Sequence, residues 1–250
     1  IYASGFSLKY LQIGQPVDQM RGYVNLGTWS EAEKDAAKAM GQAPGDPKWK
    51  DVNKDGKITL DADGQEVIGN ATPKFIYGWN NNISYKNFDL TFLIQGSYGN
   101  DIFNAVRIKT ENPANGLSVN LNNRWTTDNQ HTNVPVFLSS RERVLLDLGS
   151  NKTTGMGADQ RSSRWVEDGS YLRMKNITLT YTLPESLLNS MRVNRLSVYV
   201  TATNLFTITK YTGYDPEVSS FNAGGAGGLG IDLSNYPTAK AFMFGINLTF

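Results

Sequence analysis

The amino-acid sequence predicts an all-β fold, an antiparallel segment of a transmembrane β-barrel with long extracellular loops. The last residues, 239–250, alternate large apolar with small or polar side chains, so Phe242, Phe244 and Ile246 share one face of a strand. A strand with one apolar and one small or polar face is typical of a wall between lipid and a wet interior. Five further segments show the same period of two, and the connections between the strands alternate between long and short.

The composition of the 250 residues excludes several other classes of protein. The formal net charge is +1, from 24 basic and 23 acidic residues, so we expect no nucleic-acid partner. The chain has no cysteine, which excludes disulfides and thiolate metal sites. It also lacks the run of about 18 apolar residues that a transmembrane helix needs, whereas a barrel strand needs only about 10 residues.

Six segments alternate with a period of two and are the predicted strands: 2–13, 75–85, 88–98, 171–182, 195–205 and 239–250. Aromatic and aliphatic residues form one face of the first three, namely Phe6, Leu8 and Tyr10, then Phe75, Tyr77, Trp79, Ile83 and Tyr85, then Phe88, Leu90, Phe92 and Ile94. The fourth strand alternates cleanly only from Asn176 onward, and residues 172–175 are ambiguous. In the fifth, Leu196, Val198, Val200 and Ala202 share a face.

The lengths of the connections predict how the strands are oriented. Outer-membrane barrels have short periplasmic turns and long external loops. With Phe250 on the periplasmic side, the short connections 86–87 and 183–194 are periplasmic, and the remaining connections all fall outside. These predicted extracellular loops cover 14–74, 99–170 and 206–238.

Six strands are too few for a closed barrel, which needs about eight, and open edges do not persist in lipid. The sequence opens within a strand and shows no signal peptide. We therefore expect the chain to be the C-terminal piece of a longer protein, which supplies the missing strands.

A calcium-loop pattern is the sharpest chemical motif. Residues 51–56 follow D-x-[DN]-x-[DN]-G, in which three oxygen side chains converge and Gly56 makes the sharp turn. The twelfth position of the loop is Ala62, where a bidentate Glu is usual. The alternative is an Asx-rich turn without an ion. If Ca²⁺ or Mg²⁺ binds, we expect a structural role, with ligands from Asp51, Asn53, Asp55, Lys57, Asp61 and Asp63.

The other residues of types used in catalysis do not indicate an enzyme. His131, the only histidine, sits in a polar stretch and is interpreted as a solvated loop residue, not as the base of a hydrolase. The carboxylate pairs Glu167–Asp168 and Asp215 with Glu217 lie in segments typical of turns, and Asp215-Pro216 predicts a turn above the fifth strand. No cofactor is expected beyond the possible structural ion.

Four tryptophans of the long loops are the candidate substrate-binding residues. Aromatic side chains near strand ends are typical of an interfacial girdle, but those in loops can stack on sugar rings or contact a partner. The alternative for each is packing within its own loop. The candidates are Trp29, Trp49, Trp125 and Trp165.

Several blocks resemble the C-terminal part of SusC/RagA-type TonB-dependent outer-membrane transporters, and together they span nearly the whole chain. They are DVNKDGKI at 51–58, VIGNATPKF at 67–75, SYKNFDL at 84–90, WVEDGSYLRMKNI at 165–177 and TKYTGYDPE at 209–217.

The resemblance implies a barrel of about 22 strands, of which these would be the last six, in the outer membrane of a Gram-negative bacterium. It implies import of large nutrients, mostly oligosaccharides (glycan import) and sometimes oligopeptides, without covalent chemistry. The implied partners are the rest of the barrel with its plug, a SusD-like surface lipoprotein, TonB through the missing N-terminal part, and outer-membrane lipid. The alternatives are a passive pore or structural barrel, and a soluble calcium-stabilised binding module.

Overall fold

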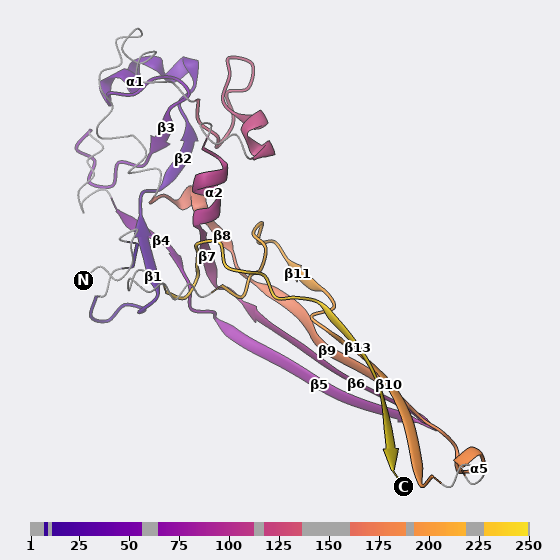
Figure 1. Ribbon diagram of the computed structural model, residues 1–250. Coiled ribbons are helices and arrows are strands. Elements are labelled where there is room, and N and C mark those ends of the chain that lie inside the picture. Colours follow the sequence, from indigo (N-terminus) through magenta and orange to yellow (C-terminus); the bar gives the residue numbers. More distant parts are fainter. Residues whose placement is uncertain are drawn as a thin grey trace. The chain divides into compact units, whose positions relative to one another are not determined.

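Five long antiparallel strands form the largest sheet, and they follow one another in the order β5–β6–β9–β10–β13. They run side by side, with the short connections and the end of β13 at the same end (Figure 1). A short strand, β11 (Thr207–Thr209), pairs with β9 and extends the sheet. The long strands are β5 (Phe75–Tyr85), β6 (Phe88–Tyr98), β9 (Tyr171–Thr182), β10 (Arg195–Thr203) and β13 (Ala241–Thr249).

This computed structural model describes residues 8–9, 12–56, 65–112, 118–136, 161–188, 193–218 and 228–249. The chain divides into two compact units. Unit 1 gathers residues 1–72, 101–167 and 217–235, which are mostly the long connections. Unit 2 comprises residues 73–100, 168–216 and 236–250 and contains the large sheet.

The register of the sheet aligns apolar with apolar side chains across the strands of unit 2. One row joins Phe88 to Tyr181, Tyr181 to Val198, and Val198 to Ile246. The aligned side chains are not covered by a second layer, because Phe244 is 81% and Ile246 69% exposed. These residues are therefore not buried between two sheets, as they would be in a β-sandwich. Their exposure is consistent with the wall of a barrel.

The opposite face of the same sheet is polar, and its side chains bond to one another across the strands. Thr178 is paired with Thr91 on one side and Thr201 on the other. The hydroxyls of Thr178 and Thr201 are 2.8 Å apart, and the Thr91 hydroxyl donates to Asn82 Oδ1 at 3.2 Å. Alternation along each strand and register between strands thus give the sheet one apolar and one polar face.

A β-bulge explains the ambiguous residues 172–175. Leu93 is opposite Asn176, but Ile94 is opposite Met174, so Lys175 is the extra residue on β9. Such an insertion exchanges the two faces of the strand beyond it. Met174 therefore continues the apolar face, and Arg173, opposite Gln95, joins the polar one.

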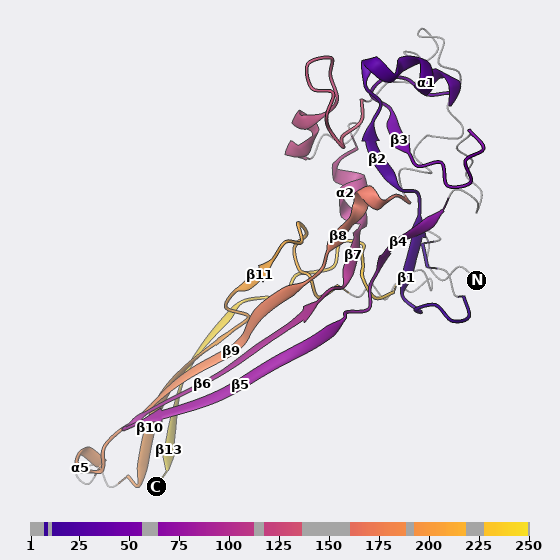
Figure 2. The same ribbon diagram turned by 180° about the vertical axis from the view of Figure 1, so that it is seen from behind.

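The described part of unit 1 contains three small sheets and several short helices. Strand β1 (Gln19–Gly22) pairs with β4 (Glu66–Asn70), and β2 (Asn25–Thr28) pairs with β3 (Pro47–Trp49). Strand β7 (Asp101–Asn104) lies between β12 (Ile231–Asp232) and β8 (Val166–Asp168) and continues into α2 (Ala105–Thr110), as Figure 2 shows. The remaining short helices are η1 (Glu31–Glu33), α1 (Lys34–Ala39), η3 (Val119–Asn123), η4 (Ser163–Trp165) and, in unit 2, α5 (Glu185–Leu188).

The core of unit 1 is assembled from segments far apart in the sequence. Leu8, Met20, Phe103, Trp165 and Ile231 are each at most 1% exposed and pack into one cluster. They come from all three stretches of the unit. Because all three stretches contribute to it, this cluster forms only when they pack together.

Of the expected first strand, 2–13, the structure describes only residues 8, 9, 12 and 13, and among these only Lys9 is in a β-bridge, an isolated antiparallel one to Met20. Residues 1–7, 10 and 11 lie outside the described residues. Gln12 and Ile13 are not in a strand, and Ile13 is fully exposed. Leu8 is buried in the core of unit 1, and its carbonyl accepts from Arg21 N at 2.8 Å. Leu8 therefore contributes to the packing of unit 1 and does not belong to the apolar face of the large sheet.

None of the helices in the described ranges has the length and the apolar character that crossing a membrane requires.

Candidate functional site

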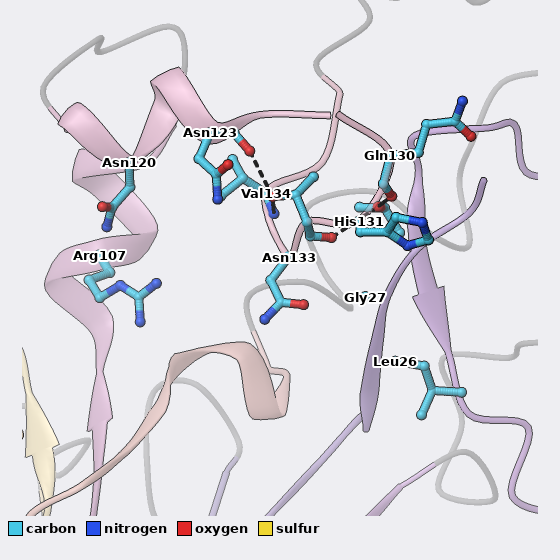
Figure 3. A pocket seen from close by; sticks show the side chains of 11 residues that line it. Leu26, Gly27, Arg107, Asn120, Asn123, Gln130, His131, Asn133 and Val134 are labelled. Carbon is cyan, nitrogen blue, oxygen red and sulfur yellow. Dashed lines mark hydrogen bonds between the residues drawn. The ribbon is translucent and has the colours of Figure 1, made fainter. Parts of the chain in front are cut away.

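A polar pocket of about 470 Å³ opens in unit 1. Its walls come from β2, from α2 and η3, and from the loop that follows η3 (Figure 3). Polar side chains predominate in its lining, which comprises Leu26, Gly27, Thr28, Arg107, Asn120, Asn123, Gln130, His131, Thr132, Asn133 and Val134.

Hydrogen bonds to the backbone fix the loop that carries His131 and Asn133. The Thr132 hydroxyl donates to Asn123 O at 2.7 Å and accepts from Val134 N at 3.1 Å. Trp125 N donates to Val134 O at 2.8 Å, which closes the loop at its base. Thr132 is buried, and its neighbours His131 and Asn133 are exposed. The loop therefore presents these two side chains from a fixed backbone.

Strand β2 holds the other wall of the pocket against this loop. The Thr28 hydroxyl donates to Thr132 O at 3.0 Å. Gly27 has φ +102°, a conformation that favours glycine. A Cβ at Gly27 would lie 3.7 Å from Asn133 Oδ1, so the bare backbone of the strand faces that amide.

The charge of Arg107 is compensated by two carboxylates that are not among the lining residues. Its guanidinium donates to Glu111 Oε1 at 2.7 Å and to Glu167 Oε1 at 2.9 Å. Glu111, whose side chain is fully buried, also accepts from Arg164 at 3.0 Å and from Asn120 at 2.9 Å. Burial alone would raise the pKa of Glu111, but the bonds from Arg107 and Asn120 outweigh it and lower that pKa.

Two side chains of the pocket keep free hydrogen-bonding groups. Among the described residues, the imidazole of His131 and the amide of Asn133 have no hydrogen-bond partner. Figure 3 shows Asn133 between Arg107 on α2 and Leu26 on β2. An amide with both a donor and an acceptor available can bind a hydroxyl or another amide. The pocket is thus suited to a polar ligand.

The signal for this pocket in the sequence is weak. Amide residues are frequent over 118–133, but they carry no motif, and a polar loop is also rich in such residues. His131 is exposed in a loop, as interpreted from the sequence. What the sequence did not reveal is that the loop is folded back against β2 and encloses a cavity.

The four candidate tryptophans are buried in unit 1, with exposed fractions of 7% or less. Trp165 is enclosed by the guanidinium groups of Arg164, at 4.3 Å from its ring, and Arg107, at 5.4 Å. Trp29 donates to Gln42 Oε1 at 2.8 Å. Trp49 packs edge-on against Tyr23, and the Trp125 ring lies where a Cβ of Gly45 would be. Each ring has a packing role, and ligand contact by any of them stays a prediction.

The first half of the calcium-like loop adopts an Asx-rich turn. The two carboxylate oxygens of Asp51 accept from Lys54 N at 2.7 Å and from Gly56 N at 2.8 Å. Asn53 and Asp55 supply further hard oxygen atoms beside it. These side-chain oxygen atoms are of the kind that binds Ca²⁺. Lys57, Asp61 and Asp63 lie outside the described residues. Within the part that the structure describes, no three His, Asp or Glu residues are grouped so as to hold a metal.

A second buried ionic cluster lies in unit 2. Arg173 donates to Asp215 Oδ1 at 2.6 Å, to the Thr207 hydroxyl at 2.8 Å and to the Thr238 hydroxyl at 2.8 Å. Asp215 Oδ2 also accepts from Thr238 N at 3.0 Å. The Asp215-Pro216 segment is thus fixed to the sheet by an ion pair, and Asp215 is engaged as a structural carboxylate.

Known proteins that are similar to the chain include bacterial receptors. It is 31% identical over 246 residues to TonB-dependent receptor P3 of Formosa agariphila, a match covering 96% of this chain and 23% of that protein. It is 30% identical over 202 residues to the TonB-dependent receptor SusC of Bacteroides thetaiotaomicron, which covers 80% of this chain and 17% of that protein. No protein-family model matches.

Solved structures of the RagAB peptide transporter share the fold. One superposes with a TM-score of 0.67 at 27% identity, over 96% of this chain and 23% of that chain. The 'open-open' state of the RagAB peptide importer gives a TM-score of 0.66 at 26% identity, over 97% and 25%. The chain thus spans about a quarter or less of the relatives it matches.

Proposed function

We propose, from the premise that this chain belongs to the SusC/RagA-type TonB-dependent receptors, that it forms part of an outer-membrane transporter importing large nutrients. Its sheet is the antiparallel barrel segment expected of that family. The observation that carries the proposal is the two-faced sheet, in which an exposed apolar face and a polar face are each kept in register over five strands.

The dimensions of the apolar face support placement in a membrane. The ten residue steps from Phe75 to Tyr85 measure about 33 Å along the strand, at about 3.3 Å per residue. A strand tilt of about 40° reduces this length to about 25 Å, the height of the apolar band of outer-membrane barrels. Aromatic pairs lie near both ends of the face, Phe75 with Tyr98 at 5.2 Å and Phe88 with Tyr181 at 4.7 Å between ring centroids. Such aromatic belts mark the two membrane interfaces.

The polar face then lines the lumen of the barrel. Threonine and asparagine side chains there bond to one another and leave donors and acceptors for a plug. We propose that a plug supplied by the rest of the protein is held against this face. The predicted lumen residues are Asn80, Asn82, Thr91, Gln95, Thr178, Thr180, Tyr199 and Thr201.

The proposed partners follow from the relatives. We propose a SusD-like surface lipoprotein that covers the mouth, and TonB, which would reach the barrel through parts of the protein outside this chain. The cargo is an oligosaccharide or an oligopeptide. The RagAB structures are named as those of a peptide transporter, which supports an oligopeptide. SusC is named only as a receptor, which favours neither cargo. We propose binding and passage without covalent chemistry, and the relatives' names describe receptors and transporters.

Uptake by whole cells tests the proposal. Cells with the full-length receptor are compared with cells lacking its gene on a panel of oligosaccharides and peptides. We expect saturable uptake that needs both the receptor and TonB. Uptake that persists without TonB and rises linearly with concentration would instead support the alternative, a passive pore.

A further inference from the structure

We infer that the polar pocket between β2, α2 and η3 binds an uncharged part of the cargo, rich in hydroxyl or amide groups, and selects against charged cargo. The inference rests on the proposed import function and adds to it the ligand chemistry of one site. It is carried by the charges around the pocket, by its free polar groups and by the types of side chain in its lining.

The described charges around the pocket cancel, because Arg107 and Arg164 are paired with Glu111 and Glu167. Among the described residues, Arg107 is the only Lys, Arg, Asp or Glu that lines the pocket. An anionic ligand would have to compete with those carboxylates for Arg107. A cationic ligand would find no carboxylate in the part of the lining that the structure describes. Removing a charged group from water without a counter-charge is unfavourable, so the pocket favours a neutral ligand.

The free polar groups match hydroxyls and amides. Asn133 presents a carbonyl oxygen and an NH₂ group, and His131 adds a ring nitrogen of each kind when neutral. Beside this loop, on η3, the Asn123 amide uses its oxygen to accept from Asn129 at 3.0 Å, while its NH₂ has no partner among the residues described. Donors and acceptors thus lie on several sides of the cavity.

The lining limits other modes of binding. No Trp, Tyr or Phe is among the described lining residues, so these offer no aromatic face for stacking. The apolar contributions are Leu26, Gly27 and Val134. Affinity must therefore come mainly from hydrogen bonds, and each of these contributes only modestly.

The test uses the full-length receptor in cells and two pairs of probes. Neutral and uronic-acid oligosaccharides form one pair, and neutral and acidic peptides form the other. Asn133→Ala removes the free amide without breaking a hydrogen bond to any described residue. Asn122→Ala is the matched control, because Asn122 is an exposed residue of the same polar segment that does not line the pocket. The amount of each variant on the cell surface is measured with an antibody.

We expect receptor-dependent uptake of a neutral probe, with a half-saturation concentration raised about three- to tenfold by Asn133→Ala, as the loss of one or two hydrogen bonds predicts. Asn122→Ala should leave it unchanged. The probe pair that responds distinguishes a sugar from a peptide. Receptor-dependent uptake of the charged probes alone, or of neutral probes without an effect of Asn133→Ala, would overturn the inference while import stands. Uptake of every probe independent of the receptor would overturn both.

Discussion

The ion pair of Arg173 with Asp215 leads to a quantitative prediction. The two side chains are only 3% and 9% exposed, and their nearest atoms are 2.6 Å apart. Removing one partner of a buried pair costs about 3–5 kcal/mol, because the other charge stays buried without compensation. Arg173→Met leaves Asp215 without its counter-charge, although the Thr238 backbone and hydroxyl still donate to it. The free energy of local opening in this region should therefore fall by about 3–5 kcal/mol.

Amide hydrogen exchange of the full-length receptor in detergent measures this change. The amides that should respond are those pairing β11 with β9 and the amide of Thr238, which donates to Asp215 at 3.0 Å. A loss of about 3–5 kcal/mol corresponds to exchange roughly 150- to 5,000-fold faster. Amides that pair β10 with β13 near Ser197, at the opposite end of the sheet, should keep their rates.

Two further variants separate the ion pair from other effects. Lys210→Met also replaces a cation in this region by methionine, but Lys210 is exposed, so a change below about 0.5 kcal/mol is expected. The double variant Arg173→Met/Asp215→Asn removes both charges and should recover part of the stability lost in the single variant. A single variant whose exchange rates rise less than about fivefold would refute the reasoning.

Three more predictions concern pH, packing and metal. The pKa of Glu111 is lowered in the folded state. Its charge therefore stabilises unit 1 at a pH above the pKa that Glu111 has in the unfolded chain, and this stability is lost as the pH falls through the lowered pKa. The protease resistance of unit 1 should decline in acid, and Glu111→Gln should flatten this decline while lowering the resistance at neutral pH. Gly96→Ala should impair barrel assembly, because the added Cβ would lie 2.2 Å from Tyr171 O. Gly78→Ala should be tolerated, because the atom nearest to its added Cβ is 3.9 Å away. The heat-modifiable electrophoretic mobility of the receptor measures the assembly of both variants. If the loop at Asp51 binds Ca²⁺, as proposed from its pattern, a chelator should lower the stability of that loop by about 1–3 kcal/mol, measured by proteolysis, and no difference between Ca²⁺ and chelator would exclude the ion.

The alternation of side chains made much of the large sheet predictable. Strands occur over the same residues as expected at 75–85, 88–98 and 171–182, because the period of two is a local property of the sequence. The capping box of Ser30 and Glu33 at the start of η1 is another pattern set by residues close in the sequence. Local patterns of this kind state which residues share a face, but not what the face packs against.

The faces of β9 near Arg173 were decided by tertiary structure. The bulge at Lys175 is defined by pairing with β6, and between these two strands lie the residues of an entire long connection. The sequence around 172–175 shows only a broken alternation, which is compatible with a strand end or with a bulge. Only the register of the neighbouring strand distinguishes the two.

The sequence by itself determined the two-faced strands, the short and long connections and the resemblance that led to the family. The tertiary structure alone decided that the long connections fold into a unit with its own core, in which Trp165 packs beside Leu8 and Ile231. It also decided that the amides after η3 enclose a pocket with β2. The physical reason is that burial and cavity formation depend on contacts between residues distant in the chain, and no periodicity along the sequence encodes such contacts.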